Sequence, residues 1–218
     1  AMAGERACIE MGSRRTNVIA AVAAARAAFV AGFAATSNLE AGRRYGVPTR
    51  GTAAHSFTLL HASEAEAFEA QLRALGEATT LLVDTYDIEA AVRTGVELTN
   101  GRLGAVRLDS GDLAELAGSV RELLDSLGAT KTRILVTSDL DEWQIAALRG
   151  APVDGFGVGT SLVTGSGAPT CGFVYKLVAR ADSDEPDAPL VPVAKKSVNK
   201  TSIGGRKFAL RRLDARGK

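Results

Sequence analysis

Short apolar segments alternate with longer helical segments along most of the chain. Strands are predicted at residues 79–83, 103–106, 133–137 and 153–157, with a further short candidate at 33–36. Between them, alanine-rich or amphipathic stretches predict helices at 17–31, 40–45, 63–75, 88–96 and 112–127, and a last helix that ends near Leu148. Strands separated by helices form βαβ units with parallel strands. Because several such units follow one another, we expect an α/β fold, with a βα barrel favoured over an open sheet.

Capping residues mark the expected ends of several helices. Thr16 is the expected N-cap of the first helix. Ser37 or Asn38 caps the short second helix, which Gly46 closes. Residues 63–66 read Ser-Glu-Ala-Glu, the pattern of a capping box at the start of a longer helix. These signals agree with the boundaries that periodicity predicts.

The two ends of the chain depart from this alternation. Residues 1–15 predict neither a helix nor a strand. Beyond residue 165, strands are predicted at 173–179 and 190–194 on either side of an acidic hairpin tip at 182–187, and a last one at 208–210. We therefore expect residues 1–164 to form a barrel core that carries the active-site turns, and residues 165–218 to complete the barrel edge or a second domain.

The composition is that of a globular enzyme and excludes several other classes of protein. With 46% hydrophobic and 23% charged residues, the 218-residue chain can bury a full core. A net charge of +1 leaves no basic surface for nucleic acid or an anionic membrane. No apolar run approaches the roughly 18 residues of a membrane span, so we expect a cytoplasmic protein. Cys8 and Cys171 lack CxxC or CxxH spacing, so we expect no disulfide or zinc site.

One of the two histidines follows a flexible, hydroxyl-bearing turn. His55 comes directly after residues 50–54, Arg-Gly-Thr-Ala-Ala, at the point where a short β-branched stretch gives way to residues that favour a helix. Turns of this kind are where α/β proteins bind ligands. His55 is therefore a candidate general base, metal ligand or phosphoryl-accepting nucleophile. His61 lies in the following helix and is expected to be structural.

An arginine and two carboxylates, Arg107, Asp109 and Asp112, follow the strand predicted at 103–106. The Arg107 guanidinium could pair with a substrate carboxylate or phosphate, and Asp109 could accept hydrogen bonds from ribose hydroxyls or hold magnesium. The alternative is that Asp109 or Ser110 only caps the next helix.

Two further pairs of aspartates invite the same two interpretations. Asp84 and Asp87 follow one predicted strand, and Asp139 and Asp141 follow another. Because carboxylates recur at successive strand ends, we favour a functional site at that edge of the sheet.

A glycine-rich turn and a basic segment are the remaining candidates. Residues 155–160 read Gly-Phe-Gly-Val-Gly-Thr, and backbone amides of such a turn, with the Thr160 hydroxyl, can approach a phosphate. It is neither a Walker A loop nor a GxGxxG motif. The basic residues Lys195, Lys196, Lys200, Arg206 and Lys207 could reach a phosphate or form a solvated surface.

Five motifs in one order carry a resemblance to a known family. They are GTAAHSF, LLVDTYD, VRLDSGDL, LVTSDLDE and DGFGVGTSLVT, and together they resemble nicotinate phosphoribosyltransferase, a type II phosphoribosyltransferase of NAD salvage. The similar stretch runs from about residue 10 to about residue 207. The resemblance implies an irregular α/β barrel joined to a second domain made from both chain ends. It also implies formation of nicotinate mononucleotide and pyrophosphate from nicotinate and phosphoribosyl pyrophosphate, coupled to ATP hydrolysis.

The resemblance assigns roles residue by residue. His55 matches the histidine that ATP phosphorylates transiently in that family. Thr52 and Arg107 match contacts to nicotinate, and Thr160 matches a contact to the phosphoribosyl group. Other residues expected to bind substrate are Arg14, Asp109, Ser138, Asp139, Gly157 and Gly159. By similarity, Asp109 and Asp139 would hold ribose hydroxyls or the Mg²⁺ that accompanies phosphoribosyl pyrophosphate and ATP. Family members are commonly dimers, so a homodimer is expected.

The chain departs from the family pattern in two ways. Residues 10–12 read Glu-Met-Gly where the family often has Asp-Phe-Gly, so Met11 would offer a thioether contact to the pyridine ring. The family's N-terminal region, with a tyrosine that contacts nicotinate, is absent. We interpret the chain as a barrel-containing fragment whose activity in isolation is open.

Three alternatives remain at this point. A nicotinamide phosphoribosyltransferase would place an aspartate near the base, whereas a cationic or hydroxyl-lined pocket favours the acid. A quinolinate enzyme would need more cations for two carboxylates and has no use for His55. A fragment that binds nucleotide without turnover is the non-enzymatic reading.

Overall fold

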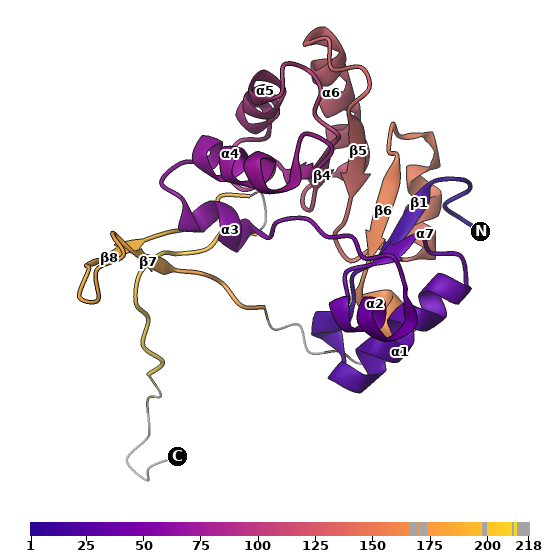
Figure 1. Ribbon diagram of the computed structural model, residues 1–218, viewed down its shortest axis with the longest axis horizontal. Coiled ribbons are helices and arrows are strands. Elements are labelled where there is room, and N and C mark those ends of the chain that lie inside the picture. The colour runs from indigo at the N-terminus through magenta and orange to yellow at the C-terminus, as the bar shows by residue number, and fades with distance from the viewer. Residues whose placement is uncertain (166–169, 171–173, 198–199, 211, 213–218) are drawn as a thin grey trace.

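The computed structural model describes residues 1–165, 170, 174–197, 200–210 and 212. Its main body is a curled six-stranded sheet in the order β2-β1-β6-β5-β4-β3, in which every neighbouring pair is parallel (Figure 1). The strands are β1 (Ala7–Glu10), β2 (Ala35–Thr36), β3 (Thr80–Leu82), β4 (Ala105–Leu108), β5 (Arg133–Val136) and β6 (Gly155–Val158). Strands β1 and β6, the first and the last of these six in the sequence, pair with one another inside the sheet, as they do in a barrel. The predicted α/β barrel architecture is confirmed, in the form of a half-barrel with edges at β2 and β3.

Helices alternate with these strands as the sequence predicts. They are α1 (Val18–Val30), α2 (Leu39–Tyr45), α3 (His55–Leu60), α4 (Glu64–Leu75), α5 (Ile88–Leu98), α6 (Leu113–Ser126), α7 (Glu142–Ala147) and α8 (Thr160–Thr164), with 3₁₀ turns η1 (Ser13–Arg15) and η2 (Leu148–Gly150). Helices α4, α5 and α6 line up beside one another along one side of the sheet (Figure 1). No helix among the described residues is long and apolar enough to cross a membrane.

The core lies between the sheet and these helices. Leu81, Val106 and Ile134, from three adjacent strands, are completely buried, and so are Val92 of α5 and Leu124 of α6. Burying one such side chain contributes about 1.5–3 kcal/mol to folding. Because the apolar faces of α5 and α6 pack against these strand residues, the helices cover this side of the sheet.

Side-chain caps hold most helix starts where they were predicted. Asn38 caps α2, and Gly46 closes it in the left-handed conformation. Ser63 caps α4 by accepting a hydrogen bond from the Glu66 backbone. The prediction that Thr16 caps α1 was wrong. The cap is Asn17, whose side-chain oxygen accepts hydrogen bonds from the backbone amides of Ile19 and Ala20.

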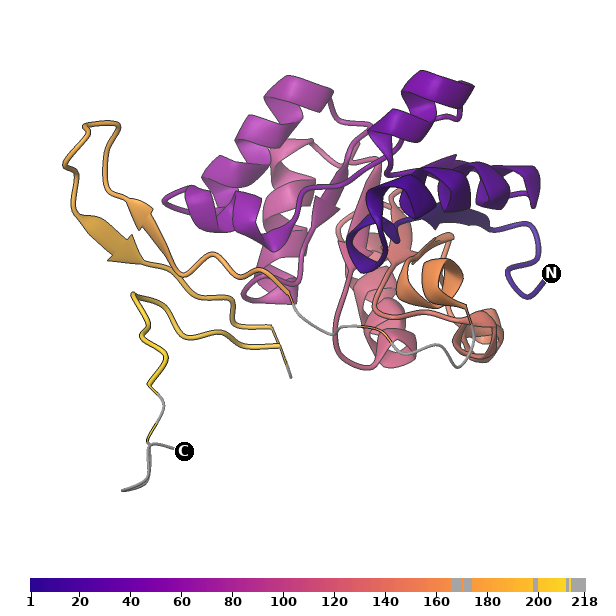
Figure 2. The same ribbon diagram turned by 90° about the horizontal axis from the view of Figure 1, so that it is seen from below.

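The chain ends differ from the prediction. Strand β1, in a region predicted to have no regular structure, lies inside the sheet, and the polar residues around its four-residue span hide its pattern. The strand predicted at 173–179 is only β7 (Ala179–Ala181), with residue 173 outside the described part, and its antiparallel partner is β8 (Leu190–Pro192). No strand forms at 208–210, where Phe208 and Leu210 are exposed and have no neighbouring strand to pair with. The β7–β8 hairpin projects from the end of the molecule remote from the N-terminus (Figure 2).

Candidate functional site

The candidate site lies at the carboxyl ends of the parallel strands. We call the residues that directly follow β1 to β6, together with the His55 turn, the rim. In a parallel sheet these ends meet at one edge, which is where α/β proteins bind ligands. The turn at 50–54 runs from Thr49, which bridges to Thr36 beside β2, to His55 at the start of α3. His55 in turn reaches Thr85 beyond β3, so this turn connects the two edges of the half-barrel.

His55 lies between two carboxylates of the rim. Its Nδ1 is 3.1 Å from the hydroxyl of Thr85. Its Nε2 is 3.6 Å from Asp84 Oδ1 and 3.7 Å from Asp109 Oδ2. Two acidic groups on one edge of the ring stabilise an imidazolium or another ring cation. The predicted convergence of the histidine with the acidic turns is therefore present in the structure.

The paired aspartates divide their roles in a regular way. In each pair the second aspartate caps the next helix: Asp87 caps α5, Asp112 caps α6 and Asp141 caps α7. The first member of each pair, Asp84, Asp109 or Asp139, faces the rim instead. The capping interpretation is therefore confirmed for Asp87, Asp112 and Asp141, and neither Asp109 nor Ser110 is a helix cap. Asp84, Asp109 and Asp139 remain the candidates for substrate binding.

Asp84 and Asp109 are held in one network of hydrogen bonds. Asp84 is buried, and its Oδ2 accepts from the Ser110 hydroxyl and, at 3.3 Å, from the Asp109 backbone. Asp109 accepts from the Thr137 hydroxyl. Burial by itself raises the pKa of Asp109, but His55, Arg107, Thr137 and Lys200 outweigh burial and hold it below its usual range. Asp109 is therefore a carboxylate when the site works.

The Arg107 side chain points to the Thr52 turn. Its Nη1 donates to the Thr52 hydroxyl, which joins two residues that sequence similarity had paired. Burial lowers the pKa of Arg107, Asp109 and Asp84 oppose that effect, and the positive charge of Arg14 adds to it. Two guanidinium groups, from β4 and from the turn after β1, thus act on the same region of the rim.

A segment from beyond the sheet completes the rim. The Lys196 backbone donates to Thr85 O at 3.0 Å, and the Ser197 hydroxyl donates to Asp84 O. Lys200 Nζ donates to Asp109 O at 2.6 Å and to Ser138 Oγ at 3.1 Å. Lys195 is buried, and burial lowers its pKa although Asp84 and Asp109 act in the opposite direction. Of the basic residues singled out in the sequence, Lys195 and Lys200 belong to the rim.

The glycine-rich stretch is mostly strand and not turn. Residues 155–158 form β6, and only Gly159 and the start of α8 follow it. A Cβ at Gly157 would lie 2.5 Å from Thr137 Cγ2 and 2.7 Å from Met11 Sδ, so glycine is needed there for packing. Thr160 Oγ1 donates to Asp139 Oδ1 at 3.4 Å. The predicted phosphate turn is thus reduced to Gly159, Thr160 and their neighbours.

Three buried polar atoms of the rim have no hydrogen-bond partner among the described residues. They are His55 Nε2, Asp84 Oδ1 and Arg107 Nε. Native proteins satisfy almost all buried polar atoms, so such atoms gathered in one place indicate where a polar ligand binds. The described residues contain no cluster of three or more His, Cys, Asp or Glu side chains suited to a metal ion.

Sequence reasoning missed several residues of the rim. Glu10 is completely buried at the end of β1 and bonded to Thr36, and Thr85 contacts His55. A glutamate in an unrecognised strand and threonines after short strands give no signal without the topology. His61 is structural as expected: Nδ1 lies 2.8 Å from Phe57 O.

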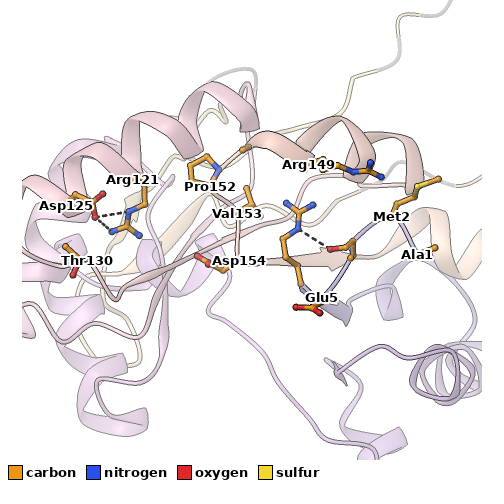
Figure 3. Close-up of a pocket in the computed structure, with 14 residues that line it drawn as sticks. Ala1, Met2, Glu5, Arg121, Asp125, Thr130, Arg149, Pro152, Val153 and Asp154 are labelled. Carbon is orange, nitrogen blue, oxygen red and sulfur yellow. Dashed lines mark hydrogen bonds and ion pairs between the residues drawn. The ribbon is translucent and has the colours of Figure 1, made fainter.

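A separate hollow of about 780 Å³ lies at the opposite, amino-terminal end of the strands (Figure 3). It is lined by residues 1–6 and by side chains that include Arg121, Asp125, Arg149 and Asp154. Arg121 is bonded there to Asp125 (Figure 3). None of the predicted site residues lines this hollow, so it is not part of the rim.

The curated relatives compared with this chain share the name nicotinate phosphoribosyltransferase. The chain is 61% identical over 99% of its length to nicotinate phosphoribosyltransferase pncB1 of Mycobacterium tuberculosis, and covers 48% of that protein. It is 40% identical to nicotinate phosphoribosyltransferase of Bacillus subtilis, with 95% of this chain and 44% of the relative covered. The crystal structure of nicotinate phosphoribosyltransferase from Porphyromonas gingivalis matches the fold with a TM-score of 0.78 at 20% identity, over 90% of this chain and 56% of that one. No family model matches the chain. The chain spans about half the length of the curated relatives it matches.

Proposed function

Because the chain belongs to the nicotinate phosphoribosyltransferase family, we propose that it carries the catalytic rim of such an enzyme. The reaction joins nicotinate to phosphoribosyl pyrophosphate, releases pyrophosphate and is coupled to ATP hydrolysis. The observation that carries this proposal is the convergence of His55 Nε2, Asp84 Oδ1 and Arg107 Nε, all buried and without a hydrogen bond among the described residues.

The cationic part of the rim suits the acid substrate. Nicotinate has a carboxylate, which pairs well with the Arg107 guanidinium because an arginine fork matches the two oxygens. The Thr52 hydroxyl, already bonded to Arg107, fixes the direction of that fork. Arg14 adds a second positive charge nearby.

The transfer itself exchanges one bond for another at the anomeric carbon. The pyridine nitrogen of nicotinate gives its electron pair to C1 of the ribose, while the bond from C1 to the pyrophosphate oxygen breaks and pyrophosphate leaves with that electron pair. Positive charge develops on the ribose between the two events, and nearby carboxylates stabilise it. Asp109, whose carboxyl pKa is held below its usual range and which lies 3.7 Å from His55 at the end of β4, is our candidate for this role.

Asp109 and Asp139 are also the carboxylates that would hold magnesium with the substrate phosphates. Magnesium usually takes one or two protein carboxylates and completes its shell with water and phosphate. A bound magnesium ion would neutralise charge on the pyrophosphate leaving group.

His55 is proposed to couple ATP to turnover. A ring nitrogen with a free electron pair attacks the γ-phosphorus of ATP, the bond from phosphorus to the ADP oxygen breaks, and ADP leaves with those electrons. The carboxylates of Asp84 and Asp109 beside the ring stabilise the positive charge that the imidazole gains in this step. Water later takes the phosphoryl group, which returns His55 to its starting form.

A nicotinamide phosphoribosyltransferase is the second candidate, because Asp84 and Asp109 act electrostatically on Arg107 and could bind an amide. We also propose a homodimer and a cytoplasmic location, both in line with the family resemblance.

The experiment that tests the proposal supplies the full-length protein with phosphoribosyl pyrophosphate, ATP and magnesium, and compares nicotinate with nicotinamide. We expect nicotinate mononucleotide and pyrophosphate in equal amounts and at least about tenfold lower kcat/KM for the amide, since a buried arginine left without its anionic partner is costly. Preference for nicotinamide would refute the acid specificity, and no product from either base would refute the proposed activity.

A further inference from the structure

Glu10 has a degree of burial that needs an explanation. It is 0% exposed at the end of β1, between β2 and β6, and glutamate is almost never fully buried unless it is paired. Both of its oxygens have partners: Oε1 accepts from the Gly12 backbone at 2.5 Å, and Oε2 accepts from the Thr36 hydroxyl. The carboxylate therefore ties the turn after β1 to the end of β2.

The network continues from Thr36 to the same turn. Thr36 Oγ1 accepts from the Asn38 backbone at 2.9 Å, and Asn38 Nδ2 donates to Ser13 Oγ at 3.0 Å. Ser13 is the first residue of η1, which contains Arg14. Glu10 thus holds the turn directly at Gly12 and, through Thr36 and Asn38, indirectly at Ser13.

The turn is also fixed from the opposite side. A Cβ at Gly12 would lie 2.2 Å from Val163 Cγ1 and 2.9 Å from Gly159 O, so the turn lies directly against the chain that follows β6. Val163 and Gly159 on one side and the buried Glu10 carboxylate on the other therefore fix the position of Gly12, directly before η1. This sets the place from which the Arg14 side chain departs.

The exposed Arg14 side chain departs from this turn. Its positive charge helps to lower the pKa of Arg107, whose side chain is directed to Thr52. Two guanidinium groups repel one another unless an anion lies between them. Both substrates supply such a group, since nicotinate has a carboxylate and phosphoribosyl pyrophosphate has phosphates.

We propose that Glu10 is a positioning residue that sets the turn at residues 12–15, so that Arg14 and Arg107 share one anionic group of the substrate. The inference rests on the proposed function, because it takes the rim as the substrate site. Glu10 touches neither substrate and acts only through the direction of Arg14.

The test is a double-mutant cycle in the full-length protein, with KM for each substrate and kcat measured separately. The variants are Glu10→Ala, Glu10→Gln, Thr36→Val, Arg14→Ala and the double variant Glu10→Ala with Arg14→Ala. Glu40→Gln removes a half-buried glutamate of α2 that is paired with Arg43 and Arg44 of the same helix, and it serves as the matched control. Calorimetric binding of nicotinate and of phosphoribosyl pyrophosphate repeats the cycle without turnover, so that failure of the proposed activity and failure of this inference are told apart.

We expect Glu10→Ala to raise KM for one of the two substrates by about tenfold with kcat within about twofold, the size of one lost positioning hydrogen bond. In the Arg14→Ala background the same change should add less than about twofold. Glu10→Gln should retain most affinity, because its amide can still accept from Gly12 and donate to Thr36. Thr36→Val should change KM in the same direction, and it carries the test if Glu10→Ala does not fold.

A raised KM for nicotinate would identify the shared anion as its carboxylate, and a raised KM for phosphoribosyl pyrophosphate would identify it as a phosphate. Equal effects of Glu10→Ala with and without Arg14, or lower thermal stability with both KM values unchanged, would overturn the proposal.

Discussion

The Lys200 ammonium donates a hydrogen bond to the carbonyl oxygen of Asp109 at 2.6 Å, across 91 positions of sequence. Its second hydrogen bond, to Ser138 Oγ, reaches the end of the next strand, β5. One side chain from beyond the sheet thus connects two turns of the rim, and Asp109 is also the residue beside His55.

Lys200→Met should therefore lower kcat/KM for phosphoribosyl pyrophosphate by about 10- to 100-fold, since hydrogen bonds to a charged group contribute about 1.5–3 kcal/mol. Lys196→Met removes a neighbouring exposed lysine and should have little effect. Steady-state kinetics of both variants test this expectation. If kcat/KM fell equally in Lys200→Met and Lys196→Met, the positive charge of the segment would matter and the hydrogen bonds of Lys200 would not.

Arg107→Lys tests the geometry of the base site. The lysine keeps a positive charge but loses the planar fork and its bond to Thr52. We expect KM for nicotinate to rise by at least about tenfold, because one point charge cannot replace a bidentate contact. The rise in KM for phosphoribosyl pyrophosphate should be smaller. Arg133→Lys, at an exposed position of the adjacent strand β5, is the matched control. An unchanged KM for nicotinate would contradict the assignment.

Gly157→Ala tests the packing of β6. The added methyl group would meet Thr137 Cγ2 and Met11 Sδ at distances that real contacts do not reach. We expect the free energy of unfolding to fall by about 1–3 kcal/mol, the usual cost of overpacking. Gly118→Ala in α6 has nothing within 4 Å and should instead raise stability, by about 0.5–1 kcal/mol. In denaturant unfolding, the two variants should change the free energy of unfolding in opposite directions. If Gly157→Ala were as stable as the parent, Thr137 and Met11 would have to be able to move aside.

Glu64 is predicted to make stability depend on pH. Burial, with help from Asp84 and Asp87, raises the pKa of its carboxyl from 4.5 to about 7. The folded protein then holds a proton that the unfolded chain has lost, so the free energy of unfolding falls as pH rises through that window. Glu64→Gln cannot ionise, so its melting temperature relative to the parent should increase between about pH 5 and about pH 8. Glu97→Gln, in an exposed position of α5, controls for the lost charge, and a difference that does not change with pH would refute the prediction.

The sequence predicted the repeating part of the fold because each strand and helix there has its own signal. The apolar cores of β3, β4 and β5 and the caps of α2 and α4 are local features, and the structure has them at or near the predicted residues. Strand β1 was missed because it is four residues long and ends in a buried glutamate. Its place in the sheet depends on pairing with β2 and β6, which no local pattern expresses.

The candidate site also contains residues with a local sequence signal and residues that only distant contacts reveal. His55, Arg107 and Asp109 were found because rare or charged residues followed predicted strands, and the structure brings them together. Glu10, Thr85 and Ser197 were not found, because their importance comes from contacts with distant residues. The aspartate pairs could not be divided between caps and site from sequence, since both roles require the same side chain at nearly the same place.

Phosphorylation of His55 by ATP is the step on which the proposed coupling depends, and it can be measured directly. The full-length protein and its His55→Ala variant are incubated with γ-labelled ATP, and the stability of the label to acid and base is determined while nicotinate mononucleotide is measured in the same reaction. We expect an acid-labile, base-stable label on the parent that is absent from His55→Ala, and we expect ATP to stimulate product formation in the parent alone. Nicotinate mononucleotide formed with ATP but without any label on the parent would contradict the role of His55.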